Sequence, residues 1–330
     1  SATRTGVTQC SSTMTRRSAL TLLGASSAAA IAFLAACSPR DSAANSSSAQ
    51  NQNSSAPLVL TTFTVIQDMA SRVAGEFCQV ESITKAGAEI HDYEPTPDDL
   101  KRAQKAQLIL NNGLGLERWF ERFVADSQAQ RADLSEGITA IPIAEGDYQG
   151  QANPHAWMSP ANGKIYVENI VRALSNLVPD HAKDFEVNGD AYKKELDNIS
   201  SHLIEELSTL PESQRTLVTC EGAFSYLCRD TNMKELYLWA VNAADEGTPQ
   251  QIAKVVETVK AQQIPAVFCE STVSPKAMQQ VADETGAVLK TDEKNILYVD
   301  SLSEADGPVP TYLDLLQHDA DAIVSGLIGR

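Results

Sequence analysis

Short apolar runs alternate with amphipathic helical segments from residue 58 onward, and this alternation limits the fold more than any other feature. The predicted strands cover residues 58–62, 79–84, 107–110, 138–141, 216–219, 265–268, 287–289 and 297–299. Predicted helices at 67–74, from Thr96, at 116–127 and at 159–177 separate the strands of the first half. Strands that alternate with helices indicate parallel βα units, so the predicted fold class is α/β.

One helical pattern is much longer than the others. Residues 184–210 keep an almost unbroken helical spacing, with one apolar face formed by Leu196, Ile199, Leu203, Ile204 and Leu207. Such a helix is ~40 Å long at 1.5 Å per residue, which suits a rigid connection between two lobes. We therefore predict a parallel-sheet α/β lobe at 58–180, a linking helix at 181–212 and a second α/β lobe at 213–330.

The first 57 residues are predicted to direct export and anchoring. Arg16 and Arg17 precede an uncharged, largely apolar stretch that ends in Leu34-Ala35-Ala36-Cys37, the lipobox pattern of bacterial lipoproteins. We expect residues 1–37 to be a lipoprotein signal with Cys37 as the lipid-bearing residue, and residues 38–57 to be a flexible tether. A twin-arginine or an ordinary export signal, a start at Met14 and an uncleaved membrane anchor all stay open.

Net charge excludes one class of partner. The 330 residues include 26 Lys and Arg against 43 Asp and Glu, a formal charge of -17. Removal of residues 1–36 takes away three Arg and no acid, which leaves 23 basic against 43 acidic residues, or −20. Nucleic-acid binding needs clustered basic side chains, so we expect no nucleic-acid partner.

Two histidines and two acids stand where α/β folds place ligands. His91 and His155 lie on loops just before helices that begin with Thr96 and Ser159, and Glu221 and Asp300 directly follow predicted strands. Two imidazoles and two carboxylates suit Mn(II) or Fe(II) better than the thiolate-rich sets of structural zinc sites.

Five ordered motifs then carry a family resemblance. They are His91-Asp92-Tyr93-Glu94-Pro95, Asn111-Asn112-Gly113-Leu114-Gly115-Leu116-Glu117, Asn153-Pro154-His155-Ala156-Trp157, Glu221-Gly222-Ala223-Phe224-Ser225-Tyr226 and Asp300-Ser301-Leu302. The pattern resembles the metal-binding lipoproteins of manganese and zinc ABC importers over residues 58–330, and most of all the manganese-binding member from cyanobacteria.

The resemblance implies a fold and a cargo. It implies two α/β lobes joined by a long rigid helix, with the metal in the cleft between them on His91, His155, Glu221 and Asp300. Zinc members typically carry His at the position of Glu221 and a His-rich acidic loop, whereas residues 145–153 contain no His. The expected cargo is therefore Mn2+, with Zn2+ and Fe2+ as alternatives, and the expected partners are an ABC permease and its ATPase.

Further residues near the site have predicted roles. Glu94 and Glu270 are candidates to orient a ligating His from behind, with a plain surface position as the alternative. Cys220 and Cys269 each end a predicted strand of the second lobe, immediately before an acid. If those strands are neighbours, ~5 Å apart, a Cys220–Cys269 disulfide is feasible in an oxidising compartment.

Other functions are weaker alternatives. A hydrolytic or oxygenase metalloenzyme would need an open coordination position, whereas four protein ligands without an adjacent nucleophile indicate a carrier. An adhesin or scaffold lipoprotein with a structural metal is a third reading. Gly113-Leu114-Gly115 follows a strand, but Arg118 occupies the third glycine position of a dinucleotide fingerprint, which argues against nucleotide binding.

Overall fold

Apolar four-residue stretches form the centre of the first sheet. In the computed structural model, β1 (Leu58–Thr61) and β3 (Leu108–Asn111) lie between the edge strands β2 (Gln79–Ser82) and β4 (Gln130–Asp133). The order is β2-β1-β3-β4 and every pair is parallel. The central strands are buried because neighbours cover both their edges and both their faces.

The structure describes residues 56–242 and 247–328. The predicted signal 1–37, Cys37 and the predicted tether up to residue 55 lie outside the described residues. In the described part of the chain, no helix is both long enough and apolar enough to cross a membrane.

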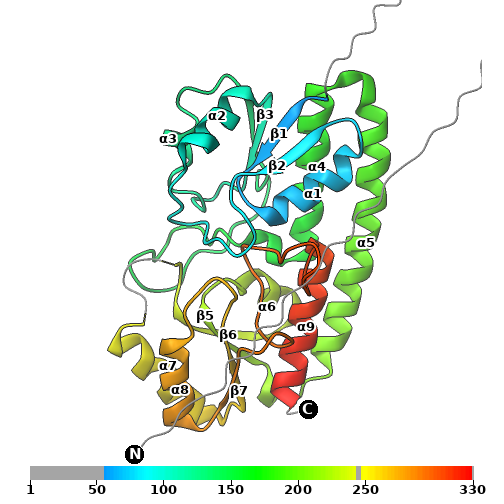
Figure 1. The fold of residues 1–330 in the computed structure, drawn as a ribbon. Coiled ribbons are helices and arrows are strands. Elements are labelled where there is room, and N and C mark those ends of the chain that lie inside the picture. Colours follow the sequence, from blue (N-terminus) through cyan, green and yellow to red (C-terminus); the bar gives the residue numbers. More distant parts are fainter. Residues whose placement is uncertain (1–55, 243–246, 329–330) are drawn as a thin grey trace, which may run out of the picture. The chain divides into compact units, whose positions relative to one another are not determined.

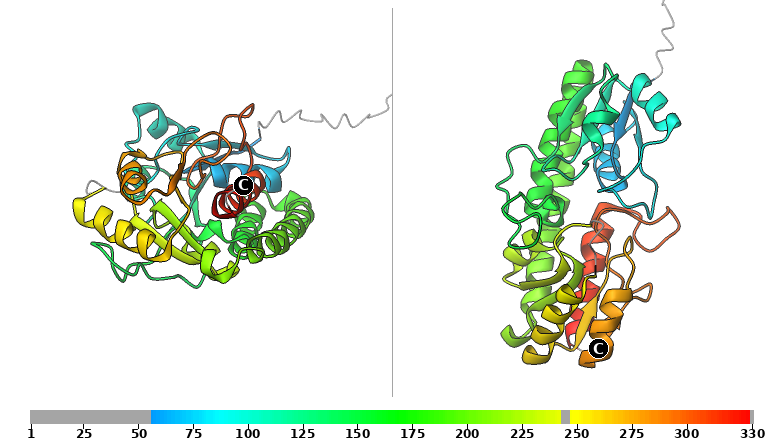
Figure 2. Two further views of the ribbon diagram at one scale, coloured as in Figure 1. Left: turned by 90° about the horizontal axis from the view of Figure 1, so that it is seen from below. Right: turned by 90° about the vertical axis from the view of Figure 1, so that its left-hand side faces the viewer.

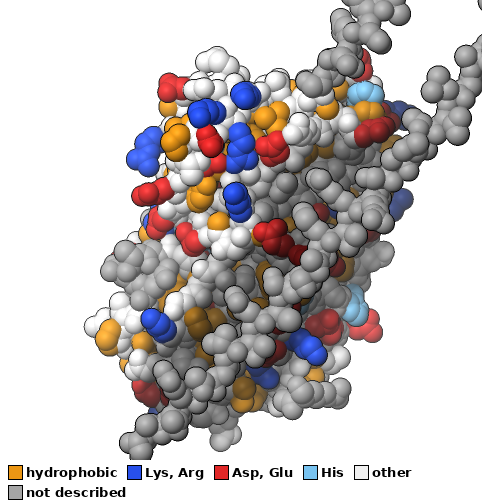
Figure 3. Space-filling model, in the orientation of Figure 1, with side chains coloured by type: hydrophobic (Ala, Val, Ile, Leu, Met, Phe, Trp, Pro, Cys, Tyr) orange, Lys and Arg blue, Asp and Glu red, His pale blue; other side chains and the backbone are white. Residues whose placement is uncertain are grey.

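Helices cover the two faces of the first sheet. The helices α1 (Thr64–Ala74) and α4 (Pro160–Leu177) lie on the side of the long helix α5, and α2 (Pro97–Lys105) and the short α3 (Phe120–Phe123) lie on the other side (Figure 1). Thr96 is the N-cap of α2, as its sequence predicts, and it also forms a capping box with Asp99. On the face drawn in Figure 3, Lys and Arg side chains of this lobe lie among Asp and Glu side chains.

The predicted long helix is α5, Ala182–Ser208. It packs antiparallel to α4 and then runs along the second lobe, where it lies beside α9 (Tyr312–Ile328) (Figures 1 and 2). Leu196, Leu203 and Leu207 are buried on its apolar face, but Ile204 is 44% exposed. The apolar stripe is thus one residue narrower than the spacing predicted.

The second lobe contains two parallel strand pairs. Strand β5 (Thr216–Glu221) pairs with β6 (Lys234–Trp239), and β7 (Ala266–Phe268) pairs with β8 (Val288–Lys290). The helices of this lobe are α6 (Ser225–Thr231), α7 (Pro249–Gln262), α8 (Lys276–Thr285) and α9. Short 3-10 turns occur at Ala156–Met158, Pro179–His181 and Glu212–Gln214.

Three element predictions were wrong. Residues 138–141 form no strand, and the fourth strand of the first sheet is β4, whose sequence QRAD is mostly exposed at the sheet edge and carries no apolar signal. The helix predicted at 116–127 is confined to α3. Residues 297–299 contribute only a parallel bridge between Leu297 and Glu270.

Candidate metal centre

His91 sits on a tightly held loop between β2 and α2. The Glu89 carboxylate accepts hydrogen bonds from the backbone N–H groups of His91 (2.7 Å) and Asp92 (3.0 Å). The carbonyl of Ile90 accepts one from the indole N–H of Trp119 at 2.9 Å. These bonds fix the backbone on both sides of the imidazole, which is fully buried.

His155 is oriented by the residue two positions before it. The Asn153 side-chain oxygen lies 2.8 Å from Nδ1 of His155 and also accepts from the His155 backbone N–H. Because an amide oxygen can only accept, Nδ1 carries the proton and Nε2 keeps its lone pair for a ligand. The Asn153 amide donates to the carbonyl of Gly222 at 2.7 Å, which ties this loop to the second lobe.

The second lobe supplies the acids. Glu221 is the last residue of β5, and its Oε1 accepts from the backbone N–H of Asn242 at 2.9 Å. Asp300 follows the Leu297 bridge, and its Oδ1 accepts from the Thr272 hydroxyl at 3.0 Å. Its Oδ2 is buried without a hydrogen-bond partner among the described residues.

The structure brings these side chains from both lobes to one place. Glu221 Oε1 lies 2.9 Å from His91 Nε2 and 3.3 Å from His155 Nε2, and the two Nε2 atoms are 3.3 Å apart. Donor atoms at right angles around an ion, with bonds of ~2.1 Å, are ~3 Å apart. His91, His155 and Glu221 therefore have the spacing of donors to one ion, and His91 is also within 4.8 Å of donor atoms of Glu89 and Asp300.

The electrostatics of this cluster favour a cation. Burial raises the pKa of Asp300, and the Glu221 charge adds to it, so that this pKa is about 7. Burial opposes ionisation of Glu221 too, but the two imidazoles outweigh it and hold its pKa well below its usual range. Burial would lower the pKa of His91, yet the Glu221 carboxylate raises it to about 9. Burial lowers the pKa of His155.

No Lys or Arg of the described residues pairs with Glu221, Asp300 or Glu270; the ion pairs of Glu221 are with the two imidazoles. Asp300 and Glu270 are buried without an ion pair, and unpaired buried carboxylates are costly, so a divalent cation is the natural compensation. The geometry and the charge of the cluster agree on the same kind of ligand.

Neither of the two residues predicted to orient a His contacts an imidazole. Glu94 is exposed, and the structure records no contact between it and either imidazole. Glu270 is buried, but its Oε1 accepts from the Glu221 backbone N–H at 3.1 Å, so it holds the backbone of Glu221 and not a His. The residue that the sequence analysis missed is Glu89; its place two residues before His91 was the available signal.

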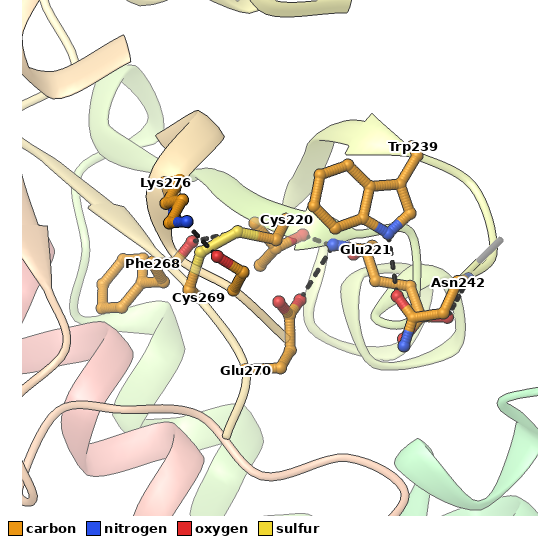
Figure 4. The surroundings of a disulfide bond; sticks show 10 residues. Cys220, Glu221, Trp239, Asn242, Phe268, Cys269, Glu270 and Lys276 are labelled. Carbon is orange, nitrogen blue, oxygen red and sulfur yellow. Dashed lines mark hydrogen bonds between the residues drawn. A yellow bond between two sulfur atoms is a disulfide. The ribbon is translucent and has the colours of Figure 1, made fainter. Parts of the chain in front are cut away.

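Cys220 and Cys269 form a disulfide with a Cα–Cα distance of 5.1 Å. Figure 4 shows the bond next to Glu221 and Glu270, which follow the two cysteines. Strands β5 and β7 lie beside each other without pairing as one sheet, so the disulfide is a direct covalent cross-link between the two strand pairs, in addition to the chain that connects them. Cys78 and Cys228 are buried free thiols.

Taken together, two parallel βα lobes, a rigid helix along both and a buried imidazole–carboxylate set between them define a solute-binding protein for a divalent metal ion. Residues 59–326 match the family described as zinc-uptake complex component A, periplasmic. The chain belongs to this family. It is the extracytoplasmic metal-binding component of an ABC importer and not an enzyme.

Relatives named for different metals match most of this chain. The iron-binding protein YfeA of Yersinia pestis is 51% identical over 81% of this chain and 85% of its own. The manganese-binding lipoprotein MntA of Halalkalibacterium halodurans is 35% identical over 82% and 88%. The solved structure of a Mn-bound periplasmic metal-binding protein from Candidatus Liberibacter asiaticus is 36% identical, with a TM-score of 0.76 over 82% of this chain and 99% of its own.

Proposed function

We propose that this protein captures one Mn2+ ion outside the cytoplasm through His91, His155, Glu221 and Asp300 and delivers it to a membrane permease powered by an ATPase. The observation that carries the proposal is the meeting of both Nε2 atoms with the Glu221 carboxylate in a fully buried place. Neutral imidazoles and carboxylates together are the ligand set that Mn(II) and Fe(II) accept.

Glu221 is the main argument for manganese over zinc. A carboxylate at this position adds a hard oxygen donor where the zinc members that the chain resembles typically carry an imidazole. The relative MntA is named for manganese, and the Liberibacter structure holds it. From the resemblance of its five motifs, we propose that the chain is a counterpart of the cyanobacterial manganese-binding member of this family.

Iron(II) is the second candidate. The relative that is 51% identical is named an iron-binding protein, and Fe(II) shares the ligand preferences of Mn(II). The two ions differ little in charge and coordination, so the choice between them has to come from loading in the cell.

Delivery depends on the ion bridging the lobes. Hydrogen bonds already cross between the lobes next to the site. Among them are those from Asn153 to the Gly222 carbonyl, from the Trp157 indole N–H to the Val299 carbonyl and from the Tyr312 hydroxyl to the Trp157 carbonyl. Ion binding adds donors from both lobes to these contacts, so the loaded protein favours one lobe arrangement. A permease can then distinguish loaded from empty protein by its surface.

The lobes 58–180 and 213–330 and the linking helix 181–212 are the units of this proposal. Lipid on Cys37 would hold the lobes beside the permease, with residues 38–57 as the tether. Labelling with a radioactive fatty acid in the wild type and in Cys37→Ala tests the anchor, and label in the variant would refute it.

Metal analysis of protein purified from its native compartment tests the cargo. We expect one Mn per chain, and Glu221→His should shift the loading towards Zn. Native loading with Zn would refute manganese as the cargo, and native loading with Fe would establish the second candidate. Uptake of Mn2+ by cells that lack the gene tests transport, because unchanged uptake would refute the delivery role.

A further inference from the structure

The acids and imidazoles of the site form two overlapping groups of three. His91, His155 and Glu221 have mutually close donor atoms, and so do Glu89, His91 and Asp300. We call the first group the inner site and the second the outer site. His91 belongs to both, so the outer site adjoins the inner one.

Solvent reaches only one of these five side chains. His91, His155, Glu221 and Asp300 are at most 1% exposed, whereas Glu89 is partly exposed. An ion that arrives from solvent in this arrangement therefore meets Glu89 before it can reach any other donor.

The outer site spans the two lobes and is held in place by the backbone. The backbone N–H of Gly87 donates to the Ser301 hydroxyl at 2.6 Å, which joins the loop of Glu89 and His91 to the loop of Asp300. The two hydrogen bonds from the His91 and Asp92 N–H groups fix the Glu89 carboxylate on its own loop. These bonds hold the three donors in place before an ion binds.

Coordinating capacity at this place is unused by the protein. Asp300 Oδ2 is buried and lacks a hydrogen-bond partner among the described residues. Each Glu89 oxygen accepts one backbone N–H, and a carboxylate oxygen has a further lone pair. Buried polar atoms without partners are rare in proteins and call for an explanation.

We propose that Glu89, His91 and Asp300 form a capture site for the incoming divalent ion, from which it passes to the inner site. The proposal rests on the proposed function, because His91 and Asp300 are also ligands there. The ion exchanges Glu89 for His155 and Glu221 and sheds its remaining water in steps instead of all at once. Glu89 then speeds both the arrival and the departure of the ion without being a ligand in the final complex.

Glu89→Gln tests this role by kinetics. It removes the charge but keeps one acceptor oxygen for the His91 N–H. We expect the association rate and the dissociation rate of Mn2+ each to fall about tenfold, the lower end of what charged groups contribute to capture. The equilibrium dissociation constant then changes less than either rate.

Stopped-flow tryptophan fluorescence measures association, since the Trp157 ring lies 5.4 Å from the His155 ring. A chase of the loaded protein with excess chelator measures dissociation. The matched control is Glu94→Gln, because Glu94 is an exposed acid of the same loop without a contact to the site; we expect both of its rates within twofold of the wild type. Glu89→Asp keeps the charge and should recover most of the association rate.

Three results would overturn the capture role. If Glu89→Gln has the same association and dissociation rates as Glu94→Gln, Glu89 has no role in capture. Faster dissociation would make Glu89 a ligand of the final complex or a support of the His91 loop. A lower melting temperature of metal-free Glu89→Gln without slower dissociation would also make it structural. If instead the wild type binds neither Mn2+ nor Fe2+ at one ion per chain, the proposed function itself fails.

Discussion

Removing the Cys220–Cys269 disulfide is expected to destabilise the second lobe by a calculable amount. The cysteines are 49 residues apart, and closing a loop of that length in the unfolded chain is worth about 4 kcal/mol at 25 °C. Both cysteines are fully buried, and the bond links β5 to the residue after β7. The double variant Cys220→Ser and Cys269→Ser should therefore lose about 4 kcal/mol of free energy of unfolding.

Urea denaturation monitored by circular dichroism measures this loss. Metal should be removed with chelator, because an ion that binds only the native protein adds its own stabilisation. Wild-type protein refolded under reducing conditions is the matched control, since it keeps both cysteine side chains, now as thiols, and lacks only the S–S bond. It should lose a similar amount, and reductant should not change the variant.

A loss below about 1 kcal/mol in both the variant and the reduced wild type would refute the loop-closure reasoning. It would mean that the unfolded chain already holds the two segments together. A large loss in the variant alone would assign the effect to the buried serines and not to the missing bond.

Three further predictions concern ion binding and folding. His91, with its pKa of about 9, holds a proton at pH 8 that the ion must displace, whereas Asp300, with its pKa of about 7, is largely ionised there. Mn2+ affinity should therefore rise several-fold between pH 8 and 9 and level off above, and calorimetry at pH 8 in buffers of different ionisation enthalpy should detect about one released proton. Asn153→Ala removes the acceptor for His155 Nδ1 and the bond to the Gly222 carbonyl, and should weaken Mn2+ binding about 10–100-fold by competition with a chelator, so an unchanged affinity would count against the orienting role. Thr248→Ala removes the capping box of α7 and should cost about 1 kcal/mol in urea denaturation, whereas Thr248→Ser should cost much less.

Local signals account for the parts of the fold that the sequence predicted well. The Thr96 cap acts on a backbone group three residues away, and helical periodicity revealed α5 because its buried face repeats every turn. Strand β4 had no such signal. It is an edge strand whose pairing with β3 supplies its stability, so its own residues need not be apolar.

The candidate site divides in the same way. Donor chemistry and position relative to strands and helices were readable from His91, His155, Glu221 and Asp300 alone. The roles of their neighbours were not, because Glu270 and Glu94 look alike in sequence. Glu270 is buried against the Glu221 N–H and Glu94 is exposed, and only the packing of the chain decides between these outcomes.

The sequence by itself determined the α/β class, the two lobes, the long helix and the four candidate donors, since each follows from short-range patterns and residue chemistry. The tertiary structure decided which acids face the imidazoles, because donors separated by up to 209 positions, from His91 to Asp300, meet only when both lobes pack. It also decided that Glu89 alone of the five is open to solvent, since burial is a property of the packed surface and not of the residue.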